Sequence, residues 1–219
     1  MRITKKRFVL IALFVFPLLF FLFLSTGINK FEKLPTLTER ATDILPNDTK
    51  VTFSNKVTVL CFVGKDADSK KGGFFNLNQK IYKEFYGFLP FQIIAVYPQG
   101  SDERIQQLSK EIGAFTDMAK WKFIEMKELE IQSLFQSLQT NETLDVDLYS
   151  NKAFIIDKDL NLRGRNDDKE AKDGKLYGYN MQSVAELNNK MDDDIKVLLY
   201  EYRAALKNRN KADRKEVGL

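Results

Sequence analysis

The fold is decided by the stretch Lys56-Val-Thr-Val-Leu-Cys-Phe-Val-Gly64, a nearly continuous apolar run that is rich in β-branched residues. Such a run predicts a strand that is buried on both faces of a parallel sheet. Residues 65–73 are polar and charged and end in two glycines, which predicts a loop. Residues 74–85 then repeat apolar side chains at helical spacing. A strand, a loop and a helix open an α/β unit, and open α/β sheets usually bind their ligands at such a loop.

The rest of the chain continues the alternation of strands and helices. Further strands are predicted where short apolar runs recur, at residues 91–97, 121–126, 153–156 and 160–165. Further helices are predicted where apolar residues recur every three or four positions, at residues 101–112, 129–138 and 183–206. This order predicts an α/β, thioredoxin-like domain over residues 51–206, with a late β-hairpin and a long C-terminal helix. Residues 207–219 are expected to form a charged C-terminal tail.

An apolar segment precedes this domain. Residues 8–24 carry no charge, and Pro17 is the one irregularity. As a helix they measure about 26 Å, so an extension to residue 28 is needed to cross a hydrocarbon core of about 30 Å. Residues 1–7 are basic and are expected to stay in the cytoplasm. The sequence therefore predicts a single-pass transmembrane signal-anchor at residues 8–28 and, at residues 29–50, a stalk that leads into the domain. Phe31, Leu34 and Leu37 are the candidates of this stalk for contact with the domain.

The anchor prediction has one rival and one consequence. A cleaved signal peptide is the rival, but the run is longer than a usual signal-peptide core and no Ala-x-Ala-like site follows it. The consequence is the location: we expect a protein of the inner (cytoplasmic) membrane of a bacterium, with its domain in the periplasm.

Charge argues against nucleic acid as a partner. The net charge is +4, and the four basic residues within positions 1–7 equal all of it, so the remainder of the chain is neutral overall. Affinity for phosphate backbones needs a concentrated basic surface. We therefore expect the partners to be the membrane and another protein.

Cysteine usage leaves two interpretations open. Cys61 is the one cysteine of the sequence, so an intramolecular disulfide is excluded. Its position inside an apolar strand favours a buried small hydrophobic residue, because burial raises the pKa of a thiol. A reactive thiol is the alternative.

In its order of elements, the chain resembles the Sco/SenC family, membrane-anchored copper chaperones of cytochrome c oxidase assembly that have a thioredoxin-like fold. Three segments carry the resemblance: Val59-Leu-Cys-Phe-Val63, Trp121-Lys-Phe123 and Phe154-Ile-Ile-Asp-Lys-Asp-Leu-Asn-Leu-Arg-Gly164. The resemblance implies a copper site made of a Cys-x-x-x-Cys loop after the first strand and a His before the late hairpin.

The positions that match these copper ligands hold other residues. Counted from Phe62, the two cysteine positions fall at Ala67 and Lys71, and counted back from Asp157 the histidine position falls at Tyr149. The chain has no His at all. Thiolate and imidazole are the ligands that suit copper. We therefore expect no cofactor and a degenerate site.

Two surface features remain as candidates. Lys70, Phe74, Phe75, Arg163 and Arg165 are candidates for a contact patch beside the degenerate site. Core packing of the phenylalanines and ordinary edge-strand charge of the arginines are the favoured alternatives. The sequence from Asp157 to Asn161 resembles the start of a calcium loop, but a hairpin turn is favoured because Leu162 stands where such a loop needs Gly.

The sequence thus favours a non-enzymatic binding or assembly factor for a respiratory complex, with the assembly role implied by the resemblance. The alternative is a thiol-disulfide or copper-handling protein that works through Cys61 or through a partner's ligands. A purely structural spacer is a third possibility.

Overall fold

The computed structural model describes residues 5–25, 33–44, 51–171 and 173–216. The chain divides into two units, Met1–Glu32 and Lys33–Leu219. In the first unit, helix α1 (Lys5–Ser25) covers most of the predicted anchor. Over the described residues, no helix has both the length and the hydropathy that a membrane crossing needs. The anchor at residues 8–28 therefore stays a prediction, and its last three residues lie outside the described part.

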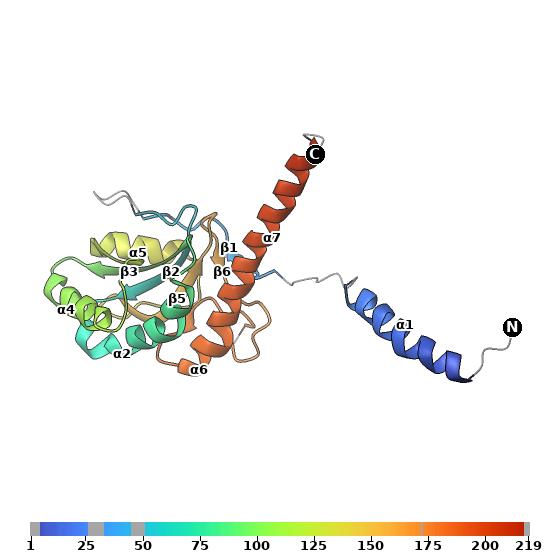
Figure 1. Cartoon of the computed structure of the whole chain (residues 1–219). Coiled ribbons are helices and arrows are strands. Elements are labelled where there is room, and N and C mark those ends of the chain that lie inside the picture. Colours follow the sequence, from blue (N-terminus) through green and yellow to red (C-terminus); the bar gives the residue numbers. More distant parts are fainter. Residues whose placement is uncertain (1–4, 26–32, 45–50, 172, 217–219) are drawn as a thin grey trace. The chain divides into compact units, whose positions relative to one another are not determined.

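The second unit is built on a mixed sheet whose described strands number seven, in the order β1-β6-β5-β2-β3-β4, with β7 paired to β5 (Figure 1). Strands β2 (Val57–Val63), β3 (Phe91–Pro98) and β4 (Trp121–Met126) are parallel. Strand β5 (Tyr149–Ile156) runs antiparallel to β2. The short strands β1 (Thr36–Thr38), β6 (Leu162–Arg163) and β7 (Tyr179–Asn180) complete the sheet.

Helices cover both faces of the sheet, which explains why β2 and β3 are apolar throughout (Figure 1). One core contains Val59 and Cys61 of β2, and the other contains Leu60 and Phe62, because successive side chains of a strand point to opposite faces. The helical segments of the first core are α2 (Ala67–Leu77), η1 (Asn78–Tyr82), α3 (Lys83–Phe85), α4 (Asp102–Gly113), η2 (Leu187–Met191) and α7 (Asp192–Glu216). Helix α5 (Glu128–Ser137) packs in the second core. The short α6 (Val184–Glu186) leads into η2.

The predicted loop at residues 65–73 is mostly wrong, because α2 already begins at Ala67. The two glycines that suggested a loop lie inside this helix. At Gly73 an added Cβ would lie 3.0 Å from both Met181 Cβ and Gln182 Nε2. Glycine is therefore present at this position for close packing of the helix against the chain near β7, and not for a turn.

The predicted stalk is also wrong for residues 33–44, which belong to the compact unit. Leu34, Ala41 and Ile44 are buried, and β1 pairs with β6 in the sheet. The three residues of β1 are too few to produce a recognisable pattern. Contacts that hold the segment come from residues about a hundred or more positions away in the sequence. Residues 45–50 lie outside the described part.

Other boundaries moved by a few residues. Strand β5 begins at Tyr149, four residues before its predicted start, and α7 continues to Glu216 into the predicted tail. The hairpin turn is confirmed: Asp157 Oδ1 accepts the backbone N–H groups of Asp159 at 2.9 Å and Asn161 at 2.8 Å.

We predict that Gly164→Ala destabilises the domain by about 1–3 kcal/mol, because the added methyl must be accommodated in a packed interior. A Cβ at this position would lie 2.2 Å from the Leu176 carbonyl oxygen and 2.7 Å from Leu37 Cδ1. Gly87→Ala is the matched control, since nothing lies within 4 Å of its added Cβ. Urea unfolding of the full chain measures both changes, and equal midpoints for the two variants would contradict the packing argument.

Candidate functional site

The degenerate site lies where the end of β2 meets the start of β5. Val63 pairs with Tyr149, and the Lys65 N–H donates to the Asp147 carbonyl oxygen at 3.0 Å. Gly64 between them has φ +75°, and a Cβ there would lie 2.7 Å from Tyr149 Cβ. Only glycine fits such a backbone approach. The fold therefore brings the segment that contains Ala67 and Lys71 close to the segment that contains Tyr149.

The three positions hold a methyl group, an ammonium group and a phenol. Ala67 is buried at the first turn of α2. Lys71 follows four residues later, on the same side of the helix, and its Nζ lies 3.0 Å from Glu111 Oε2. Tyr149 is largely buried, and the Lys70 Nζ lies 5.1 Å from the centre of its ring.

This donor set does not fit copper. A methyl group offers no lone pair, and neither does a protonated lysine amine, which here pairs with Glu111. Burial raises the pKa of the Tyr149 phenol, although a hydrogen bond from Gln182 at 3.4 Å acts in the opposite direction. The phenol is therefore protonated at neutral pH. Within the part of the chain that the structure describes, no three His, Cys, Asp or Glu side chains gather as a metal site would require.

Cys61 lies in the middle of the sheet. It is fully buried in β2, where it pairs with Ala95 of β3 and Ala153 of β5. Burial raises the pKa of its thiol well above the ordinary value. Because the thiolate is the nucleophile and the metal ligand, the folded protein keeps this sulfur in its inert form.

A polar pocket of about 540 Å³ opens beside Tyr149. Ser69 and Lys70 line it from α2, Ser150 from β5, and Gln182 from the segment after β7. These side chains can donate and accept hydrogen bonds, and the Ser69 hydroxyl donates to Asp66 Oδ2 at 2.7 Å.

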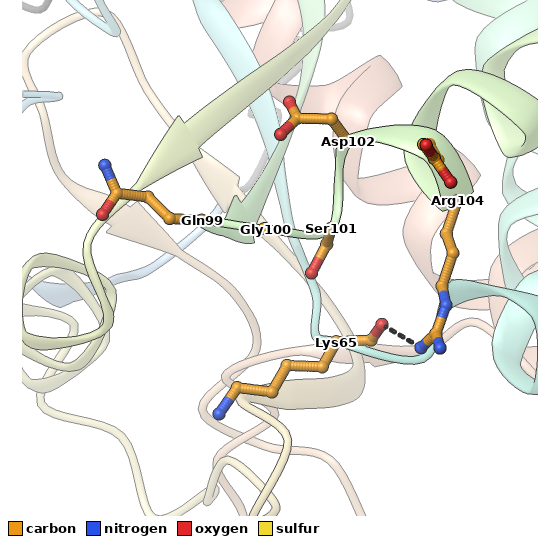
Figure 2. A pocket seen from close by; sticks show the side chains of 7 residues that line it. Lys65, Gln99, Gly100, Ser101, Asp102 and Arg104 are labelled. Carbon is orange, nitrogen blue, oxygen red and sulfur yellow. Dashed lines mark hydrogen bonds between the residues drawn. The ribbon is translucent and has the colours of Figure 1, made fainter.

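A second polar pocket, of about 600 Å³, lies at the amino end of α4 (Figure 2). Both of its cationic side chains are engaged. The Lys65 ammonium pairs with Glu128 at 2.6 Å, and the Arg104 guanidinium donates to the Lys65 carbonyl oxygen at 2.9 Å (Figure 2). Asp102 and Glu103 add negative charge. The pocket is therefore not arranged to hold an anion, and the sequence analysis did not point to it.

The predicted contact patch is wrong for three of its five residues. Phe74 is buried in the core. Arg163 is also buried, where its guanidinium contacts Asp157 at 3.0 Å, Glu201 at 2.9 Å and the Leu34 carbonyl oxygen. Arg165 pairs with Asp194 at 2.8 Å.

Both arginines thus satisfy buried or half-buried carboxylates instead of facing a partner. Sequence reasoning treated the short β6 as an edge strand, whereas β1 covers it. Lys70 and the half-buried Phe75 remain near the surface beside the degenerate site.

Comparison with solved structures supports the fold. A protein from Bacteroides thetaiotaomicron assigned as a protein disulfide isomerase is 14% identical, with a TM-score of 0.50 over 80% of this chain and 98% of that one. Copper-bound ScoI from Arabidopsis thaliana is 16% identical, with a TM-score of 0.44 over 67% and 89% of the two chains. Apo Sco1 from Thermus thermophilus is 11% identical, with a TM-score of 0.45 over 77% and 97%.

These likenesses concern the fold alone, and the two Sco structures superpose too loosely to carry an argument about the site. No family model and no curated protein matches the sequence. The chain has a mixed α/β, thioredoxin-like fold, and Sco proteins are among its structural neighbours.

We predict that a thiol reagent leaves Cys61 unmodified in the folded chain at neutral pH and modifies it after denaturation. The reason is that burial both blocks access and holds the thiol pKa above its ordinary value, so little thiolate forms. Mass spectrometry counts the modified sulfurs. The control is Leu129→Cys, at a side chain that is 79% exposed, which should accept one label in the folded state. Rapid labelling of the unaltered protein would favour the reactive-thiol interpretation.

Proposed function

We propose that this protein is a membrane-tethered, extracytoplasmic binding module that uses a thioredoxin-like scaffold for protein contact. It performs neither copper transfer nor thiol-disulfide exchange with its own residues. One observation carries the proposal: the junction of β2, α2 and β5 is intact as a scaffold, whereas Ala67, Lys71 and Tyr149 occupy its ligand positions. A scaffold without reactive groups can still present a surface to a partner.

The membrane part of the proposal rests on the sequence. Residues 8–24 are apolar and are preceded by basic residues within positions 1–7. The positive-inside rule then places the domain on the periplasmic side of the inner membrane. The partner part rests on the resemblance to the Sco/SenC family, which suggests assembly of a respiratory complex such as cytochrome c oxidase.

The alternative, a thiol or copper function through Cys61, is not favoured. The sulfur is enclosed between two strands and covered on its face of the sheet by the first core. To react, it would need an opening of the central sheet, which is usually among the most stable parts of a domain.

We predict that the purified full chain shows no tight copper binding, and that a variant with Ala67→Cys, Lys71→Cys and Tyr149→His binds one copper ion per chain. The variant supplies soft ligands at positions that the fold already brings together, and it removes the lysine charge. Competition with a chelator of known affinity measures both. The control variant carries Ala67→Ser, Lys71→Ser and Tyr149→Phe. It changes the packing at the same three positions but supplies no thiolate and no imidazole.

Tight binding of one copper ion by the unaltered chain would contradict the proposal. Failure of the Cys, Cys, His variant to bind, with its fold intact by circular dichroism, would show that the scaffold does not bring these positions into the arrangement that a metal site requires.

A further inference from the structure

An apolar pocket of about 440 Å³ lies at the opposite edge of the sheet from the degenerate site. Its walls come from the turn before β3 and from α7, namely Phe88, Leu89, Pro90, Leu199, Tyr202 and Leu206. Residues 55 and 56, which precede β2, close one side. The pocket is therefore at the amino ends of the parallel strands, whereas the degenerate site is at their carboxyl ends. We refer to these lining residues as the amino-edge surface.

Two leucines of this surface are exposed to solvent at the rim of the pocket. Leu89 is 86% exposed and Leu206 is 55% exposed, and both side chains stand at its rim. Scattered exposed leucines need no explanation, but exposed leucines around an apolar pocket form a surface that a binding partner can cover.

Three cations surround the same pocket. Lys56, Lys158 and Arg203 come from three separate segments, and among the described residues no carboxylate pairs with any of them. The Lys158 Nζ lies 4.3 Å from the centre of the Tyr202 ring, and the Arg203 guanidinium carbon lies 5.0 Å from that of Phe88. Two of the three positive groups, those of Lys158 and Arg203, thus lie over aromatic rings of the pocket walls.

The residues that line the pocket carry a net positive charge. No Asp or Glu is among the described residues that line the pocket. The nearby Lys120 has a lowered pKa, first because it is partly buried and second because of the charge of Lys56. Elsewhere in the domain, some lysines do pair with carboxylates, as Lys71 does with Glu111 and Lys190 with Asp168. Asp157 and Asp159, the sequence neighbours of Lys158, lie outside this lining but act electrostatically on the Tyr202 phenol, so the positive charge of the amino-edge surface is only partly compensated.

From this combination we propose that the amino-edge surface binds an acidic segment of a partner protein, which places apolar side chains in the pocket and carboxylates beside Lys56, Lys158 and Arg203. This proposal rests on the proposed function and names the contact surface that it needs. An apolar pocket provides the anchor, and charge complementarity at the rim provides orientation and selectivity.

A protein segment fits better than a small acid or a lipid surface. Three cations line the pocket, and several acidic residues along one segment supply a carboxylate for each of them. The apolar walls enclose a pocket, which accepts an inserted side chain. A lipid surface offers no single protruding group to fill it.

The test uses the full chain in nanodiscs of neutral lipid. The probes are three fluorescent helical peptides of equal length: a Glu/Leu peptide, a Lys/Leu peptide and a Glu/Ser peptide, each made of the two residues in its name. Anisotropy measures binding, with empty nanodiscs as the blank. We expect the Glu/Leu peptide to bind about tenfold tighter than the other two, because only it supplies both charge and apolar anchors. Hydrogen exchange should locate its protection at the turn before β3 and on α7.

Variants separate the charge from the apolar contribution. Changing Lys56, Lys158 and Arg203 to Gln should weaken binding about tenfold, whereas changing the exposed Lys80, Lys110 and Lys169 to Gln, an equal loss of charge, should not. Leu89→Ser should weaken binding about fivefold, and Leu129→Ser, at a similarly exposed leucine, should not.

Three results would overturn the proposal. The first is equal binding of all three peptides, and the second is equal affinity of the Lys56/Lys158/Arg203 variant and the Lys80/Lys110/Lys169 variant for the Glu/Leu peptide. The third is binding of phosphatidylglycerol vesicles that depends on Lys56, Lys158 and Arg203 and is not displaced by the Glu/Leu peptide. The last result would assign the surface to an anionic membrane. None of them bears on copper binding by the unaltered chain, so the failure of this proposal and that of the proposed function can be told apart.

Discussion

The structure depends on the burial of β2 between two neighbouring strands and two core layers. All seven of its residues are buried, and its side chains alternate between the core that contains α2, α4 and α7 and the core that contains α5. Parallel pairing to β3 and antiparallel pairing to β5 satisfy its backbone groups on both sides. The strand belongs to both cores of the second unit and therefore connects the helices on the two faces of the sheet.

The same strand explains why the degenerate site keeps its form. The antiparallel register of β2 and β5 puts Tyr149 beside Val63, and Gly64 lets the chain approach closely before α2 begins. This backbone arrangement does not depend on which side chains occupy positions 67, 71 and 149. A site of this kind can therefore lose its reactive groups without loss of the fold, because the core alone holds the scaffold together.

Charge is distributed unequally between the two ends of the sheet. At the carboxyl edge, Lys71 pairs with Glu111 and Arg104 donates to the Lys65 carbonyl oxygen, whereas Lys70 lies over the Tyr149 ring. In the interior, the Arg163 guanidinium of β6 pairs with Asp157 of the turn and Glu201 of α7, and it donates to the Leu34 carbonyl oxygen. Its charge therefore stabilises the packing of these segments. At the amino edge, cations lie over aromatic rings beside exposed leucines. An end of a domain with these properties is suited to contact with an acidic, partly apolar surface.

Local pattern and composition were enough to determine the class of fold, the positions of β2, β3 and β4, the turn at Asp157 and the absence of soft ligands at Ala67, Lys71 and Tyr149. The strands and the turn depend on residues that are close together in the sequence. The absence of soft ligands depends only on the residue types at positions 67, 71 and 149. Tertiary structure alone decided that residues 33–44 join the sheet, that Gly73 lies inside a helix, that Arg163 is buried, and that Lys158 and Arg203 meet at one pocket. Each of these four features depends on contacts between segments that are far apart in the chain. Such contacts leave no repeating pattern in a single amino-acid sequence.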